Sequence, residues 1–310
     1  MNQQKVIIDT DPGVDDAMAI IYAILEPAIK LVGLTSIYGN VTIEIATRNT
    51  LRLAEMADYE IPVAAGAAKP LVQELKPPST YVHGAEGFGD IPAVAPKQQP
   101  VDEPAHEFIC RMANTYPGEL VLCPVGPLTN LALALDHDLS IVDKVKSVTV
   151  MGGSLEEGGN VTEFAEANIW QDPHAAERVF SADWPITMIG LDVTHKIVCI
   201  QEEFSKLASA APKFGGFLNE AVPFYMDFHR KDKRNPVDGC HMHDPTAVIS
   251  IVNPGFFTID VTPVSVILKG EELGQTVRDT NKASPLVRVA MQVDAEAVRD
   301  KFMQIIASGS

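Results

Sequence analysis

Basic residues are scarce in this chain of 310 residues: 24 Lys and Arg stand against 41 Asp and Glu, giving a formal net charge of −17 at pH 7. A surface of that sign repels phosphate backbones and anionic lipid headgroups, so we expect neither nucleic acid nor a membrane as a partner. Long apolar runs are also missing, because no stretch approaches the roughly 20 residues that a membrane-spanning helix needs. The first residues contain no hydrophobic signal-peptide segment.

Cysteines are few and scattered. Cys110, Cys123, Cys199 and Cys240 form no C-x-x-C pair, so neither a disulfide framework nor a zinc knuckle is expected. The chain also lacks a P-loop signature and a G-x-S-x-G nucleophile elbow. With 46% hydrophobic and 21% charged residues, its composition is that of a folded protein. We therefore expect a cytoplasmic globular protein in which residues 1–310 form a single domain.

Short apolar runs alternate with amphipathic stretches over the first two thirds of the chain. Near-continuous apolar strands between helices predict an α/β fold, with an open, mostly parallel (Rossmann-like) sheet and helices on both faces. A helical flank is expected after about residue 201, followed by β-rich segments near 261–270 and 286–293. The proline-rich stretch 67–103 is expected to form a lid or a surface excursion. In such a sheet the ligand site lies beyond the carboxyl ends of the strands.

Four carboxylates follow the first predicted strand within eight residues, in the run DTDPGVDDA at 9–17. Clustered carboxylates raise one another's pKa unless a cation neutralises them. An acidic helix N-terminus would explain Asp15 and Asp16, because aspartate caps helices and suits the helix dipole. It does not explain Asp9 and Asp11 beside an apolar strand. The pattern therefore predicts a metal site, and ligands that are all oxygen favour Ca²⁺ or Mg²⁺ over zinc.

A second polar cluster, CHMHDP, lies at residues 240–245. Histidines beside a cysteine are compatible with a soft-metal site. For His241, a surface histidine capping a helix that begins at Asp244-Pro245 is an equal alternative. For His243, which precedes a carboxylate, a general acid is the more specific interpretation, because histidine titrates near neutral pH.

A third group of polar residues follows the Met-Gly-Gly sequence at 151–153. Its amide and carboxylate side chains offer the donors and acceptors that bind sugar hydroxyls, although an ordinary polar loop is an equal alternative. The residues are Asn160, Glu166 and Asn168.

In this order the motifs resemble those of the inosine-uridine preferring nucleoside hydrolases. The resemblance runs from Val6 to at least Val293 and rests on DTDPGVDDA at 9–17, GN at 39–40, P-x-GPLTN at 124–130, MGG at 151–153, AE-x-N at 165–168 and HDP at 243–245. It implies hydrolysis of the N-glycosidic bond of ribonucleosides to ribose and free base, in purine or pyrimidine salvage. It also implies a homo-oligomer, either a tetramer or a dimer.

The resemblance further implies roles for single residues. The expected Ca²⁺ ligands are Asp11, Asp16, Asp244 and the main-chain carbonyl of Val125. The expected ribose contacts are Asp15, Asn160, Glu166 and Asn168. Asn40 would orient the attacking water and Asp11 would take its proton. His243 would face the base, and His83 and Met151 would form part of the pocket wall.

Base preference stays open, because residues 224–234 align poorly with the family. Tyr225 and Phe228 are candidates for the base site, with core packing the better interpretation for at least one of them, and Trp170 fits either place. The histidine before the metal aspartate favours a pyrimidine-accepting or broad specificity. Two other functions compete with this interpretation. A haloacid-dehalogenase-like phosphatase also starts with D-x-D but has Thr or Val where this chain has Gly13, and a non-catalytic nucleoside-binding relative would keep only the ribose contacts.

Overall fold

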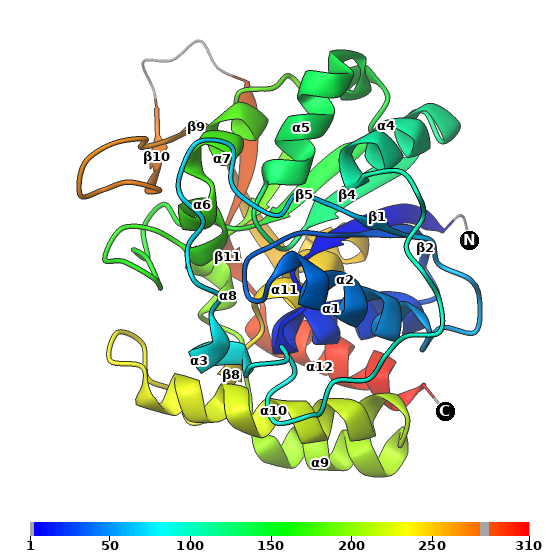
Figure 1. The fold of residues 1–310 in the computed structure, drawn as a ribbon. Helices are drawn as coiled ribbons and strands as arrows, with labels where there is room; N and C mark the ends of the chain where they lie inside the picture. The colour runs from blue at the N-terminus through cyan, green and yellow to red at the C-terminus, as the bar shows by residue number, and fades with distance from the viewer. Residues whose placement is uncertain (1–2, 280–284, 310) are drawn as a thin grey trace.

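The computed structural model describes residues 3–279 and 285–309, and its centre is a nine-stranded sheet (Figure 1). The strands lie in the order β10-β9-β11-β6-β5-β4-β1-β2-β3. Every pairing from β3 across to β11 is parallel, whereas β9 and β10 are antiparallel. This confirms the predicted mostly parallel α/β sheet. The strands are β1 (Gln4–Thr10), β2 (Ile29–Ser36), β3 (Val63–Ala65), β4 (Leu120–Pro124), β5 (Ser147–Met151), β6 (Ile186–Ile189), β9 (Phe257–Val266), β10 (Thr276–Arg278) and β11 (Leu286–Val293).

Helices cover both faces of this sheet, as Figure 1 shows for α4 and α5 on one side and α1 and α12 on the other. Alternate side chains of β1 enter different cores: Val6 and Ile8 pack against the α1 side, and Ile7 packs against the α4 side. A strand buried on both faces has no polar face, which explains its continuous apolar sequence. The covering helices are α1 (Val14–Leu25), α2 (Ile43–Ala54), α11 (His243–Val252) and α12 (Ala295–Ala307) on the first side, and α4 (Ala105–Thr115), α5 (Thr129–His137) and α7 (Pro173–Phe180) on the second.

The predicted helical flank is present as α9 (Gln201–Ala210) and α10 (Phe214–Lys231). Sequence analysis missed the C-terminal helix α12. Its Phe302 is fully buried and stacks on Tyr22 of α1 with ring centroids 6.2 Å apart. Lys301 adds an ion pair of 2.8 Å to Glu26. The last helix therefore belongs to the core that supports α1.

The proline-rich stretch after β3 runs partly over the surface, where the side chains of Val72 and Leu75 are exposed. It also turns inward at the short helix α3 (Thr80–His83), and His83 and Phe88 are buried. The expectation of a surface excursion is therefore correct for only part of this stretch, because α3 packs against α10.

The remaining elements are short. They are α6 (Ala167–Gln171), α8 (Leu191–Thr194), the two-stranded sheet of β7 (Val198–Cys199) and β8 (Cys240–His241), and the 3₁₀ turns η1 (Leu139–Asp143) and η2 (Pro254–Phe256). In the part of the chain that the structure describes, no helix is both long enough and apolar enough to cross a bilayer.

Asn130 fastens several strand ends to one another. Its Nδ2 donates to Oδ1 of Asp9 on β1 at 2.7 Å and to the carbonyl of Ser36 on β2 at 3.0 Å. Its Oδ1 accepts from the main-chain N–H of Ala67 at 2.9 Å. The side chain is fully buried, so none of these groups can exchange its partner for bulk water.

We expect Asn130→Ala to lower the free energy of unfolding by about 2–4 kcal/mol, because it leaves a buried carboxylate, carbonyl and N–H without their partner. Urea denaturation followed by circular dichroism measures this loss. The control is Asn114→Ala, which removes an exposed amide that bonds Cys110 of its own helix; it should change stability by less than about 0.5 kcal/mol. Equal stability of the two variants would contradict this account of Asn130.

Candidate active site

The loops that follow β1, β2, β4, β5 and β6 converge at one edge of the sheet and surround a cavity. Most of the site residues expected from the sequence line it: Asp15, Asn40, His83, Val125, Met151, Asn160, Glu166, Asn168, His243 and Asp244. Asp11 lines an adjoining cavity together with Asn40 and Asn168. Asp16 is fully buried behind them. The structure thus brings together residues that lie more than 200 positions apart in the chain.

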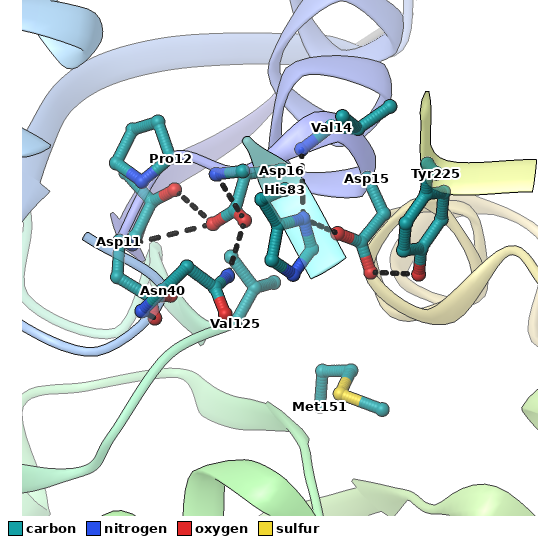
Figure 2. Close-up of polar contacts among 12 residues, drawn as sticks. Asp11, Pro12, Val14, Asp15, Asp16, Asn40, His83, Val125, Met151 and Tyr225 are labelled. Carbon is teal, nitrogen blue, oxygen red and sulfur yellow. Dashed lines mark hydrogen bonds and ion pairs between the residues drawn. The ribbon is translucent and has the colours of Figure 1, made fainter. Parts of the chain in front are cut away.

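Asp16 organises the turn between β1 and α1. Its Oδ1 accepts from Oγ1 of Thr10 at 2.5 Å and from the main-chain N–H of Asp11 at 3.2 Å. Its Oδ2 accepts from the N–H of Gly13 at 2.8 Å and from Nδ2 of Asn40 at 3.2 Å (Figure 2). Burial raises its pKa, and these hydrogen bonds oppose the rise. The side chain is consequently held in one orientation by four donors.

Asp11 lies between two glycines that leave room for its carboxylate. A Cβ added at Gly39 would lie 2.1 Å from Oδ2, and one at Gly126 would lie 2.6 Å from Oδ1. Oδ2 accepts from the main-chain N–H of Asn40 at 2.6 Å, whereas Oδ1 is buried without a partner. Burial, followed by the charge of Asp16, raises the pKa of Asp11 well above its usual value.

Asp15 and Asp244 complete a group of four buried acids. Oδ2 of Asp15 accepts from the hydroxyl of Tyr225 at 3.1 Å, and its Oδ1 has no hydrogen-bond partner. Burial, and then the charge of Asp16, raises the pKa of Asp15 to about 8. The pKa of Asp244 rises through burial and then through the charge of Asp15. Carboxylate oxygens of Asp15, Asp16 and Asp244 lie within 4.8 Å of one another.

These acids have little cationic support from the protein itself. Among the described residues, one potentially cationic side chain lies within ion-pair distance of these acids: Nδ1 of His83 is 3.8 Å from Oδ1 of Asp15. That nitrogen already accepts a hydrogen bond of 3.2 Å from the N–H of Val14, and burial lowers the pKa of His83 to about 3. His83 is therefore uncharged. Hard oxygen donors and two unpartnered carboxylate oxygens together fit a divalent cation such as Ca²⁺.

The amides on the far side of the cavity are oriented by the main chain. Nδ2 of Asn168 donates to the carbonyls of Val125 at 2.9 Å and Met151 at 3.1 Å, which leaves its Oδ1 available. Oδ1 of Asn160 accepts from the N–H of Ala167 at 3.0 Å, which leaves its Nδ2 available. Both side chains face the cavity, so this segment is more than an ordinary polar loop.

Glu166 has a structural task that the sequence did not reveal. Its two carboxylate oxygens accept from the N–H groups of Gly153, Asn168 and Ile169 at 3.0–3.1 Å, so Glu166 caps the N-terminus of α6. The side chain is buried, and burial raises its pKa against the pull of these bonds. Any hydrogen bond from Glu166 to a ligand would therefore be made in addition to this capping role.

Five histidines line the cavity, and burial lowers the pKa of each. Four of them, His195, His229, His241 and His243, form one cluster in which neighbouring rings lie 4.9–6.2 Å apart. For His229 the pKa falls to about 2 and for His241 to about 4, so these imidazoles are uncharged at neutral pH. The five residues are His83, His195, His229, His241 and His243.

His241 corrects an expectation. It lies in β8, is 1% exposed and lines the cavity, and α11 begins two residues later at His243. It is neither a surface histidine nor a helix cap, because the pairing of β8 with β7 holds its side chain against His195 and His229. Cys240 faces the apolar core. Among the described residues Cys240 belongs to no group of side chains with metal-ligand spacing, which removes the soft-metal interpretation.

Sequence analysis missed His195 and His229. His229 follows Tyr225 by one helical turn on α10, and that spacing is the signal that would have placed both on one face. Tyr225 and Phe228 both line the cavity. Trp170 lies outside it, beneath Lys76, whose Nζ is 3.5 Å from the ring centroid.

Comparison with known proteins assigns the chain to a family. A sequence model described as inosine-uridine preferring nucleoside hydrolase matches residues 6–300. The chain is 37% identical over 306 residues to uridine nucleosidase 1 of Arabidopsis thaliana, covering 95% of this chain and 90% of that protein. It superposes on a plant nucleoside hydrolase with a TM-score of 0.94 at 36% identity, covering 98% and 99% of the two chains. A purine-preferring ribonucleoside hydrolase from Gardnerella vaginalis gives 0.93 at 34% identity, covering 98% of each.

The match covers the sheet and the loops around the cavity. It supports a nucleoside hydrolase over the two alternatives, a phosphatase and a nucleoside-binding protein without activity. The chain belongs to the inosine-uridine preferring nucleoside hydrolase family and is a ribonucleoside hydrolase that acts on N-glycosyl bonds.

Proposed function

We propose that this cavity binds a ribonucleoside with its ribose against the four buried acids and its base among the histidines, and that hydrolysis there requires Ca²⁺. The observation that carries the proposal is the group of four buried carboxylates with two unpartnered oxygens in and beside the cavity. Burying such charges without a cation is strongly unfavourable. A bound divalent cation removes that penalty.

The Ca²⁺ ligands in this proposal are Asp11, Asp16, Asp244 and the carbonyl of Val125. When bound, Ca²⁺ would supply positive charge that favours binding of the ribose hydroxyls and lowers the pKa of a water molecule. Asp15 is left to accept a hydrogen bond from a ribose hydroxyl through Oδ1, because Tyr225 already occupies Oδ2.

Asn40 and Asp11 would handle the attacking water. The Nδ2 of Asn40 is committed to Asp16, so its Oδ1 is the atom left to accept a hydrogen bond from water. The unpartnered Oδ1 of Asp11 would take the proton as the water oxygen bonds to the ribose carbon. The bond from that carbon to the base nitrogen breaks, and its electron pair leaves with the base.

Positive charge grows on the ribose while negative charge grows on the base in this reaction. The carboxylates around the sugar stabilise the first charge. Asn168 through Oδ1, Asn160 through Nδ2 and Glu166 would hold the ribose hydroxyls in place. His243 would donate toward the departing base and reduce the second charge. His83 and Met151 would form the wall between the two ends.

The base end favours broad specificity, including inosine and uridine. Its lining of uncharged imidazoles, Tyr225 and Phe228 can stack on or hydrogen-bond to any nucleobase, because a neutral imidazole carries one donor and one acceptor. The names of the relatives, one a uridine nucleosidase and another purine-preferring, cover both base classes. A cytoplasmic homo-oligomer, dimer or tetramer, completes the proposal.

The first test is ribose release from inosine, uridine, cytidine and adenosine, measured with and without a chelator. Chelation should abolish turnover, and added Ca²⁺ should restore it. Asp11→Asn should remove Ca²⁺ binding by titration calorimetry and nearly all activity. The control is Glu107→Gln, which alters a second group with metal-ligand spacing among the described residues, His106, Glu107 and His137. Full activity after exhaustive chelation, or zinc in the purified enzyme, would exclude the calcium assignment.

Asn168→Ala should lower kcat/KM for all ribonucleosides by a similar factor of roughly 10²-fold, because every substrate shares the ribose. Wild-type enzyme should hydrolyse 2′-deoxynucleosides poorly, since a missing hydroxyl leaves buried polar groups unpaired. Steady-state kinetics on inosine, uridine and their deoxy forms provides both comparisons. If the variant lost activity on uridine but kept activity on inosine, Asn168 would contact the base instead of the ribose.

His243→Ala should slow natural nucleosides by ~10²–10³-fold, the usual cost of removing one hydrogen-bond donor to a developing negative charge. The same variant should hydrolyse p-nitrophenyl riboside almost normally, because nitrophenolate leaves without assistance. His137→Ala, at an exposed histidine on α5, should leave both activities unchanged. Equal losses on both substrates would mean that His243 shapes the cavity or supports Asp244.

A further inference from the structure

We propose that Thr194 is a positioning residue whose hydroxyl donates a hydrogen bond to Nδ1 of His243 and thereby directs the Nε2–H of that imidazole at the leaving base. The inference rests on the proposed function, since it concerns how the base end of the cavity is set up.

The contact is short and shielded from water. Oγ1 of Thr194 lies 2.8 Å from Nδ1 of His243, Thr194 is fully buried and His243 is 7% exposed. Residues 49 positions apart, at the end of α8 and the start of α11, are thus joined by their side chains.

The helix that carries Thr194 is fixed on several sides. The N–H of Leu191 donates to the carbonyl of Gly153 at 2.9 Å, and the N–H of Thr194 donates to Gly190 at 3.1 Å. The carboxylate of Asp192 accepts from the N–H groups of Leu155 and Glu156 at 2.9 and 2.8 Å. Because α8 is tied to the loop after β5, the hydroxyl of Thr194 has a defined position.

The direction of the hydrogen bond follows from the surroundings of the hydroxyl. Among the described residues, the hydrogen bond found for Oγ1 is the one to Nδ1 of His243. If Nδ1–H donated to Oγ1, the hydroxyl proton would be buried without an acceptor, which is costly. If the hydroxyl donates, its proton is paired and Nδ1 is the acceptor. A neutral imidazole that accepts at Nδ1 carries its proton on Nε2.

That Nε2 faces the cavity. It makes no hydrogen bond to a described residue, although the rings of His195, His229 and His241 lie 5.5–6.2 Å away, and it is not among the buried atoms that lack a partner. His243 lines the cavity wall. The free Nε2–H is therefore available to donate a hydrogen bond to the base while the bond to ribose breaks.

A neighbouring histidine has the same arrangement. Nδ1 of His83 accepts from the main-chain N–H of Val14 at 3.2 Å, so its proton also lies on Nε2. At His83 a backbone group fixes the tautomer, whereas at His243 a single side chain does. Thr194 is thus the position at which substitution can release the imidazole without disturbing the backbone.

The test compares Thr194→Val, which keeps the shape and removes the hydroxyl, with Thr194→Ser, which keeps the hydroxyl. Measurements use the calcium-loaded enzyme. On inosine and uridine, Thr194→Val should lower kcat/KM by roughly 10- to 100-fold, the range found when the partner that orients a histidine is lost. On p-nitrophenyl riboside it should stay close to wild type. Thr194→Ser should recover most of the activity.

Nitrogen-15 NMR of histidine-labelled enzyme provides a readout independent of turnover, with His243→Ala to identify the resonances. Wild type should show the Nε2–H tautomer at His243, and Thr194→Val should show a mixture. An Nδ1–H tautomer in wild type, or equal losses on natural and activated substrates, would overturn the proposal. Failure of wild type to release ribose would instead overturn the proposed function, and the NMR result on Thr194 would still stand.

Discussion

Mutual repulsion of buried carboxylates is the constraint on which this structure depends. Asp11, Asp15, Asp16 and Asp244 are all at least 95% buried, and burial raises the pKa of each one. The charges of neighbouring acids raise the pKa of Asp11, Asp15 and Asp244 further. The surrounding fold reduces this cost with main-chain donors, as at Asp16, and with space, as at the two glycines beside Asp11. The unpartnered oxygens that remain define where a cation and a sugar would be bound.

Much of the fold could be predicted from the sequence, because parallel strands buried on both faces have continuous apolar sequences. The acid cluster could be predicted as well, because polar residues directly after such strands meet at one edge of the sheet. The helix α12 was missed although Val298, Phe302 and Ile305 recur at helical spacing. Its role as support for α1 depends on a contact between the two ends of the chain, which local pattern does not encode.

The histidine cluster of the cavity was much harder to predict. His195 directly follows α8, His229 lies on α10, and His241 lies on β8 within the CHMHDP run, where the sequence left its role open. Only the packing of α10 against α3 and the pairing of β7 with β8 bring these rings together. For Glu166 the sequence suggested a sugar contact but not its capping of α6. That capping depends on the conformation of the loop after β5, which the motif does not encode.

The two ends of the cavity are built from different parts of the architecture. The carboxylates and Asn40 follow strands of the central sheet or, at Asp244, begin a core helix, whereas the histidines and Tyr225 come mainly from short or peripheral elements (Figure 1). Changes in α3, α8, α10 or β8 therefore do not have to disturb the strands that hold the acids. With the proposed roles, this division would let recognition of the nucleobase change without changing the residues around the sugar.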